Sequence, residues 1–161
     1  MKIYVAGKIQ KESIFGTHHW RENFVTELAK LSELDLENID PLATESPHQT
    51  PLQIFQKDCR LIAACDAFIV NLTDDISVGG SQEILIARYL HKPVIGLAPK
   101  GGKFNGATRE MFGKILTDYK DPFVFSTCDA VCSTLKEVAR VLKNPLPVST
   151  GLAIIDESLR R

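Results

Sequence analysis

Short apolar runs alternate with helical patterns along most of this chain, and this alternation limits its fold more than any other feature. The runs at 3–6, 67–72 and 93–98 are typical of buried strands, and weaker strand signals lie at 35–42 and 122–126. Helical spacing is found at 18–34, 50–65, 81–90, 108–119 and 129–142. Strands separated by helices indicate a parallel sheet that is covered on both faces. We therefore predict an α/β fold that is flavodoxin-like (Rossmann-like), with an open five-stranded sheet of order 2-1-3-4-5.

Ligands of such sheets bind above the carboxyl ends of the strands, where the strand order reverses between strands one and three. The turn after residues 4–7 and the loop at 77–83 both reach that crevice. The length of 161 residues suits one domain. We predict a single domain at 1–145, with the ligand crevice in it, and a C-terminal arm at 146–161.

Composition excludes several classes of partner. The net charge is −1, so we expect no binding to nucleic acid polymers or membranes, and no apolar run approaches the length of a membrane span. The four cysteines match no common zinc spacing, and we interpret them as free thiols of a cytoplasmic protein. We predict no metal and no cofactor.

Glu83 is a carboxylate in an unusual place. It follows a glycine-containing loop, Ser77-Val78-Gly79-Gly80-Ser81-Gln82, and we expect it in the first turn of the helix at 81–90. Ala87 and Leu90 follow it at helical spacing, so Glu83 lies at the start of a row of apolar side chains on one face of the helix. The helix dipole would favour its ionised form. The carboxylate is therefore either a structural cap or a nucleophile.

Asp58 and Tyr4 are candidates to act beside Glu83. Asp58 shares the inward stripe of its helix with Ile54 and Leu61, so a specific partner or a shifted pKa is expected, unless it caps a loop. Tyr4 lies in the first strand and is either a core residue or a hydroxyl that pairs with a carboxylate. Two carboxylates and a tyrosine are a plausible apparatus for breaking a glycosidic bond, in the manner of retaining glycosidases.

Two loops offer contacts to a ligand. Gly79 and Gly80 allow close approach to backbone N–H groups, although neither a dinucleotide fingerprint nor a P-loop is present. The loop that starts Gly7-Lys8-Ile9 is either an anion site or a solvated turn.

These residues together resemble the nucleoside 2-deoxyribosyltransferase family, including its branch of 2'-deoxynucleoside 5'-monophosphate N-glycosidases. The matching pieces are Ile3-Tyr4-Val5-Ala6-Gly7, Asp58 with Asp66-Ala67-Phe68-Ile69-Val70 eight residues later, Gly79-Gly80-Ser81-Gln82-Glu83, and Lys92-Pro93-Val94. The resemblance spans about residues 2–98, and agreement is weaker afterwards.

The resemblance implies that Glu83 forms a deoxyribosyl-enzyme intermediate, that Tyr4 orients it, and that Asp58 binds the sugar hydroxyl or assists proton transfer to the base. The substrate would be a nucleoside or a nucleoside 5'-monophosphate. The resemblance also implies a homo-oligomer, a dimer or higher, in which a neighbour's loop completes the pocket. Residues 102–111, with Asn105, correspond to that loop.

Several positions depart from the pattern of the family or of one of its branches. Ser77 stands where transferases of free nucleosides carry an aspartate, which favours the nucleotide-hydrolysing branch, because a serine does not repel a phosphate. That branch, however, prefers a serine at Lys8 and an arginine at Gln10. Leu85 stands where the family often has glycine.

The sequence leaves several alternatives open. It does not decide between transfer and hydrolysis, deoxyribose and ribose, or free nucleoside and 5'-monophosphate, and it does not give the base or the oligomer size. A catalytically silent nucleotide-binding or regulatory module is the alternative function, and a flavodoxin-like electron carrier is a third.

Overall fold

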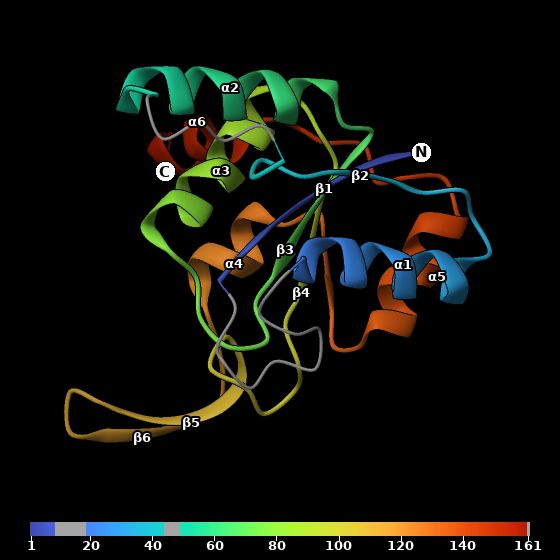
Figure 1. The fold of residues 1–161 in the computed structure, drawn as a ribbon. Helices are drawn as coiled ribbons and strands as arrows, with labels where there is room; N and C mark the ends of the chain where they lie inside the picture. The colour runs from blue at the N-terminus through green and yellow to red at the C-terminus, as the bar shows by residue number, and fades with distance from the viewer. Residues whose placement is uncertain (9–18, 44–48, 161) are drawn as a thin grey trace.

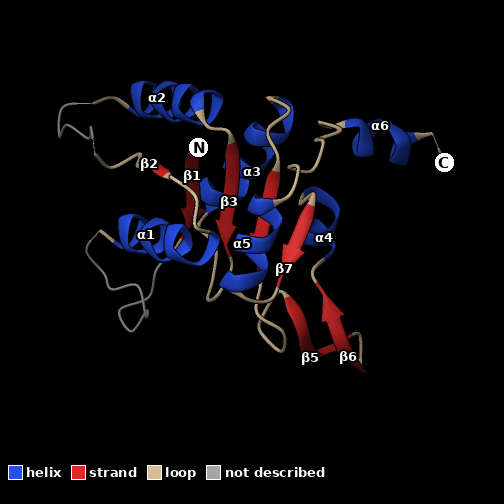
Figure 2. Ribbon diagram, turned by 90° about the vertical axis from the view of Figure 1, so that its right-hand side faces the viewer, coloured by secondary structure: helices blue, strands red, loops and turns tan. Residues whose placement is uncertain are grey.

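The computed structural model describes residues 1–8, 19–43 and 49–160, and its centre is a five-stranded parallel sheet. The strands follow the order β2-β1-β3-β4-β7 (Figure 2). Their bounds are β1 Lys2–Gly7, β2 Glu37–Ile39, β3 Ala67–Asn71, β4 Val94–Leu97 and β7 Ala130–Cys132. The predicted fold class and strand order are confirmed, with β7 in the fifth place.

Helices cover both faces of the sheet (Figure 1). Helices α1 Trp20–Ser32 and α5 Leu135–Lys143 cover one face, and α2 Pro51–Ala64 and α3 Val78–Tyr89 cover the other. Successive side chains of a strand point to opposite faces. Ile3 and Val5 of β1 therefore join the apolar cluster under α1 and α5, whereas Tyr4 points to the cluster under α2 and α3.

The start of α2 agrees with the helical spacing found at 50–65. Thr50 is the N-cap and Pro51 is the first helical residue. The Thr50 side chain accepts a hydrogen bond from the Gln53 N–H at 3.3 Å, and the Gln53 side chain accepts one from the Thr50 N–H at 2.8 Å. This reciprocal cap fixes the first turn of the helix that carries Asp58.

The helix predicted at 108–119 is wrong. This stretch belongs to an antiparallel hairpin, β5 Asn105–Met111 and β6 Lys114–Lys120. Phe112 and Gly113 connect the strands with φ values of 53° and 70°, and two successive positive φ values are typical of a tight hairpin turn. The residue pair Phe112-Gly113 was the sequence signal that the helical spacing obscured.

The strand predicted at 122–126 is also wrong. These residues form α4 Pro122–Thr127, because Asp121 caps the N–H groups of Phe123 and Val124 at 3.0 and 3.1 Å and Pro122 suits the first helical position. The fifth strand is β7, which lies within the stretch predicted as the last helix. Pairing with β4 converts Ala130–Cys132 into a strand, and α5 begins only at Leu135.

The C-terminal segment leads to α6 Ala153–Leu159. It is attached to α3, because Thr150 Oγ1 accepts a hydrogen bond from Arg88 Nη2 at 3.0 Å. The buried Arg88 guanidinium also forms an ion pair with Asp129 at the start of β7. The division at residue 145 stays a prediction. No helix in the described ranges is long and apolar enough to cross a membrane.

Candidate active site

A hydrogen bond joins Tyr4 to Glu83 near the switch point of the sheet. The Tyr4 hydroxyl donates to Glu83 Oε1 at 3.1 Å. The Tyr4 ring is fully buried and stacks on Phe68 of the adjacent strand, with centroids 5.4 Å apart and planes 11° apart. The stacking fixes the direction of the hydroxyl, so Tyr4 has both a place in the core and a carboxylate partner.

Glu83 lies in the second turn of α3, and the prediction of the first turn is wrong. The helix begins at Val78, because the Ser77 side chain caps it by accepting the Gly80 N–H at 3.1 Å. Gly79 and Gly80 therefore lie inside the first turn instead of in a preceding loop. A Cβ at Gly80 would lie 3.1 Å from Ile76 Cγ1, so the absence of a side chain lets the first turn pack closely on the chain before it.

Burial controls the charge state of Glu83. Burial raises the pKa of this carboxyl, the Tyr4 hydrogen bond lowers it, the Asp58 carboxylate raises it and Arg21 lowers it. The net direction is upward. Desolvation therefore outweighs the helix dipole, which was expected to favour the ionised form of Glu83. The ionised carboxylate is held in an unfavourable environment, which is a common property of reactive groups.

Asp58 belongs to the same cluster. It lies on α2 with a side chain 19% exposed, and its Oδ1 is 3.8 Å from Lys57 Nζ, which also donates to the Pro41 carbonyl at 2.6 Å. The pKa of Tyr4 is raised by burial, then by Glu83 and by Asp58. Three side chains from β1, α2 and α3 are thus brought together, as the sequence suggested. Their catalytic roles stay predictions.

Arg21 is a site residue that the sequence reasoning missed. Its Nε donates to the Val5 carbonyl at 2.9 Å, its guanidinium lies 4.5 Å from the Trp20 ring centroid, and Nη1 is 4.0 Å from Asp40 Oδ1. Arg21 lowers the pKa of both Tyr4 and Glu83. A cation in the first turn of the helix that follows the first strand was the available signal, since that turn lies at the carboxyl edge of the sheet.

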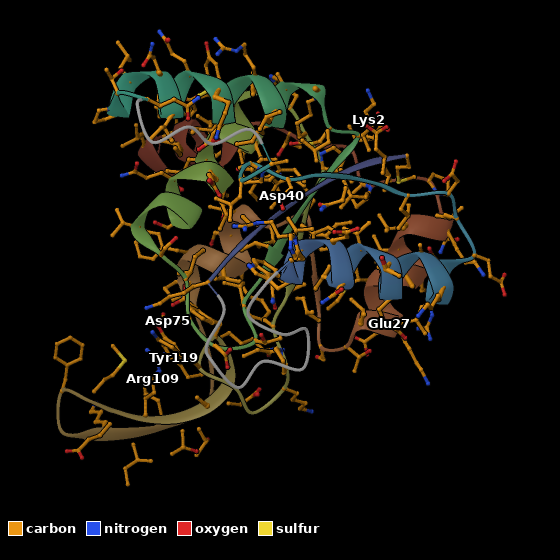
Figure 3. All side chains as sticks on the ribbon, in the orientation of Figure 1. Lys2, Glu27, Asp40, Asp75, Arg109 and Tyr119 are labelled. Carbon is orange, nitrogen blue, oxygen red and sulfur yellow. The ribbon has the colours of Figure 1, made fainter. Side chains whose placement is uncertain are left out.

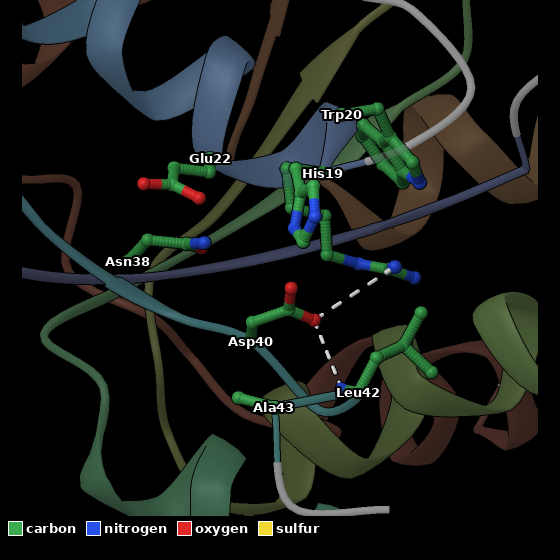
Figure 4. A pocket seen from close by; sticks show the side chains of 8 residues that line it. His19, Trp20, Glu22, Asn38, Asp40, Leu42 and Ala43 are labelled. Carbon is green, nitrogen blue, oxygen red and sulfur yellow. Dashed lines mark hydrogen bonds and ion pairs between the residues drawn. The ribbon is translucent and has the colours of Figure 1, made fainter.

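A cavity of about 560 Å³ opens beside this cation (Figure 4). Its lining includes His19, Trp20, Arg21, Asn38 and Asp40. Asn38 Oδ1 is buried and has no hydrogen-bond partner among the described residues. The volume and the mixture of aromatic and polar groups are typical of a small-molecule site.

The predicted binding residues have varied structural settings. Gly7 has φ of 146°, and a Cβ there would lie 2.8 Å from the Asn71 carbonyl oxygen, so the close contact of β1 with β3 requires glycine. Lys8 is exposed and forms a β-bridge with Asp75. Ile9 and Gln10 lie outside the described residues.

Asn105 has a structural position within its own chain. It is buried at the base of the hairpin, and its Nδ2 donates to the Ala98 carbonyl at 2.9 Å and to Ser133 Oγ at 3.4 Å. These contacts fix the point where the hairpin leaves the domain. A contact of Asn105 with a neighbour's ligand stays a prediction.

The four cysteines are free thiols. Burial raises the pKa of Cys65 and Cys132 to about 11 and that of Cys128 to about 12, so these thiols are protonated at neutral pH and are poor nucleophiles. Burial also raises the pKa of Cys59. Across the described residues, no group of three His, Cys, Asp or Glu side chains is placed to hold a metal ion.

Comparison with known proteins places the chain in a family. A model of the nucleoside 2-deoxyribosyltransferase family matches residues 3–118. The chain therefore belongs to this family of enzymes, which act on nucleoside-type substrates at the N-glycosidic bond. No curated protein matches the sequence.

Solved structures with low sequence identity share the fold. A conserved protein from Enterococcus faecalis V583 is 19% identical, with 88% of this chain and 96% of that chain covered and a TM-score of 0.61. A 2-desoxiribosyltransferase from Leishmania mexicana is 18% identical, with 90% and 99% covered and a TM-score of 0.59. The α/β architecture is common to all three chains.

Replacing Tyr4 by phenylalanine tests the role of its hydroxyl. We expect turnover to fall by about 10²-fold, because Glu83, the predicted nucleophile, loses the hydrogen bond that is predicted to orient it. The acid limb of the pH–rate profile should move to higher pH, because the hydrogen bond lowers the pKa of Glu83. The measurement is steady-state kinetics of both proteins across pH, and their melting temperatures show whether the fold is kept. An unchanged rate and pH profile would show that Tyr4 has only a structural role.

Replacing Arg21 by glutamine tests its electrostatic role. Arg21 lowers the pKa of Glu83, so its loss should raise that pKa and move the acid limb of turnover to higher pH. Arg140→Gln, which removes an exposed arginine on α5, is the matched control and should leave the limb in place. Identical profiles for the two variants would contradict a link between Arg21 and the carboxylate.

Proposed function

We propose that this enzyme cleaves the N-glycosidic bond of 2'-deoxyribonucleosides or their 5'-monophosphates through a covalent deoxyribosyl-Glu83 intermediate. The sugar then passes to another base or to water, in a role in nucleotide metabolism and salvage. The observation that carries the proposal is the hydrogen bond from the buried Tyr4 hydroxyl to Glu83 Oε1, with Asp58 close enough to affect the pKa of both groups.

The chemistry requires two displacements at one carbon. The Glu83 carboxylate attacks C1' of the sugar, and the electron pair of the broken C–N bond leaves with the base. Asp58 binds the sugar hydroxyl or supplies the proton that the leaving base takes up. A second base or water then attacks C1', loses a proton and releases Glu83. Tyr4 holds the free carboxylate in line for the first attack.

The cavity beside Arg21 is a candidate place for the base. Asn38 and Asp40 give the cavity polar side chains for the edge of a nucleobase, and Trp20 supplies an aromatic wall.

The 5' substituent would lie toward the start of α3. Ser77 is neutral, and the N-terminus of α3 with Gly79 and Gly80 is suited to an anion. Lys8 adds a cation, although Asp75 lies opposite it in a β-bridge. Lys103 donates to Asp75 Oδ1 at 2.6 Å, and this hydrogen bond is the main cause of the lowered pKa of Asp75, to which Lys8 adds. The proposal therefore includes tolerance of a 5'-phosphate.

The alternative function is a catalytically silent nucleotide-binding or regulatory module. A module that only binds has little use for a buried carboxylate whose ionisation is unfavourable. Chromatography of free base, after incubation with a panel of nucleosides and 5'-monophosphates with and without an acceptor base, separates the two functions. Binding without release of base from any member of the panel would support the silent module.

Replacing Glu83 by glutamine or alanine tests the nucleophile. We expect base release to be abolished and the sugar adduct, detectable by mass spectrometry after a denaturing quench of the wild type, to be absent. The fold should persist. Because the pKa of Glu83 is raised in the folded state, its ionisation costs stability as pH rises through that pKa, so Glu83→Gln should melt no lower than wild type at pH 7. Near-normal turnover at an unchanged melting temperature would remove Glu83 as the nucleophile.

Paired substitutions at Lys8 and Asp75 test the 5'-phosphate. Lys8→Ala should weaken nucleoside monophosphates by about 1–3 kcal/mol and leave free nucleosides nearly unchanged, because only the phosphate makes a charge-assisted contact. Asp75→Asn should tighten the monophosphates, because it removes the competing negative charge. Lys136→Ala, on the exposed side of α5, is the charge-matched control. Equal effects of Lys8→Ala on both substrate classes would contradict a phosphate site at Lys8.

A further inference from the structure

Among the described residues, Lys57 is the only buried lysine. It lies on α2, and its side chain is 11% exposed. Taking an ammonium group out of water costs free energy unless polar groups of the protein replace the water. A lysine on the outer side of α2 would avoid this cost. The partners of the buried ammonium group therefore indicate its role.

The Lys57 ammonium group contacts two separate parts of the chain. Its Nζ donates a hydrogen bond to the Pro41 carbonyl at 2.6 Å and lies 3.8 Å from Asp58 Oδ1. Side chains at adjacent positions of a helix do not normally face each other, so the ion pair of Lys57 with Asp58 is not a simple result of helical spacing. One ammonium group thus joins a carboxylate of the candidate site to the backbone after β2.

Pro41 lies in the segment 40–43, which we call the cavity turn. Asp40 and Leu42, on either side of Pro41, line the cavity described above, and the Asp40 side chain accepts the Leu42 N–H at 2.9 Å. Asp40 Oδ1 also pairs with Arg21 Nη1 at 4.0 Å (Figure 4). Figure 3 shows Asp40 between α1 and α2. The cavity turn is therefore held from α1 by Arg21 and from α2 by Lys57.

The charge of Asp58 affects the groups around it. Burial is the main cause that raises the pKa values of Tyr4 on β1, Glu83 on α3 and Cys59 on α2, and the Asp58 carboxylate adds to it in each. A nearby opposite charge favours the ionised form of a carboxyl group, so the Lys57 ammonium favours an ionised Asp58. An ionised carboxylate accepts hydrogen bonds and has no proton to donate.

We propose that Lys57 is a positioning residue, which holds Asp58 ionised and in place for a sugar hydroxyl and fixes the cavity turn relative to it. This inference rests on the proposed function, in which Asp58 meets the sugar and the cavity receives the base. Because one ammonium group contacts both parts, it sets the separation of the sugar site from the base site. Of the two roles considered for Asp58, the ion pair favours the hydrogen bond to the sugar hydroxyl.

A purely structural role would make Lys57 a clamp between α2 and the cavity turn. The hydrogen bond to the Pro41 carbonyl would be sufficient for a clamp, and the charge would have no effect on turnover. The loss of a clamp lowers the melting temperature and leaves the pH profile in place. The pH profile of base release therefore distinguishes a positioning residue from a clamp.

Replacing Lys57 by methionine removes the charge and keeps an unbranched side chain. We expect kcat/KM for base release to fall by about 10-fold to 10²-fold, because Asp58 and the cavity turn lose their common partner. The acid limb of kcat/KM should move up by about one pH unit, because Asp58 ionises less readily without the cation. Lys57→Arg keeps the charge and should restore the limb. Lys136→Met, at an exposed lysine of α5, is the matched control and should change neither quantity.

The same substitution in an Asp58→Asn background tests whether Lys57 acts through Asp58. There Lys57→Met should change kcat/KM by less than about 3-fold and should leave the acid limb in place. Equal losses in the two backgrounds would contradict the proposal. Melting temperatures show which variants are folded, and if Lys57→Met does not fold, Lys57→Gln removes the charge and keeps a hydrogen-bond donor.

The outcomes separate this inference from the proposed function. A wild type that releases base, together with a folded Lys57→Met or Lys57→Gln variant of unchanged pH profile, would overturn the role of Lys57 alone. A wild type that releases no base from any nucleoside or 5'-monophosphate would overturn the proposed function, and the role of Lys57 in turnover with it.

Discussion

The pairing of β1 with β3 is the constraint on which the rest of this structure depends. These strands occupy the middle of a parallel sheet, with Tyr4 opposite Phe68 and Gly7 opposite Asn71. The register stacks the Tyr4 ring on Phe68 and directs its hydroxyl at α3. It also brings the carboxyl ends of both strands to one edge, where parallel sheets bind their ligands. A shift of one residue would turn Tyr4 to the opposite face and abolish the pair with Glu83.

The candidate site balances burial against nearby charge. Desolvation and the carboxylate of Asp58 raise the pKa of Glu83. The Tyr4 hydroxyl and Arg21 lower it. The helix that carries Glu83 is held at its other end by the buried pair of Arg88 with Asp129. Breaking such a pair leaves an uncompensated buried charge, so this contact keeps α3 in place even though it lies outside the site. The buried carboxylate of Glu83 is thus carried by a helix whose other end is held by a buried ion pair.

Particular residues explain where prediction from sequence succeeded. Continuous apolar runs such as 67–72 can satisfy their backbone only as buried strands, and Thr50-Pro51 starts a helix through local hydrogen bonds alone. The errors fell where local signals conflicted. Residues 108–119 carry helical spacing, yet the Phe112-Gly113 turn folds them into a hairpin. At 122–126 apolar content suggested a strand, but the Asp121 cap started a helix.

The sequence by itself determined the class of fold, the order of the sheet and three side chains, Tyr4, Asp58 and Glu83, that the fold assembles. It could do so because strand and helix signals are local, and because a carboxylate on an apolar line is conspicuous without any structure. Only the tertiary structure decided that burial raises the pKa of Glu83 and that Arg21 joins the cluster. These properties depend on distances between elements far apart in the chain, and no pattern of neighbouring residues encodes such distances.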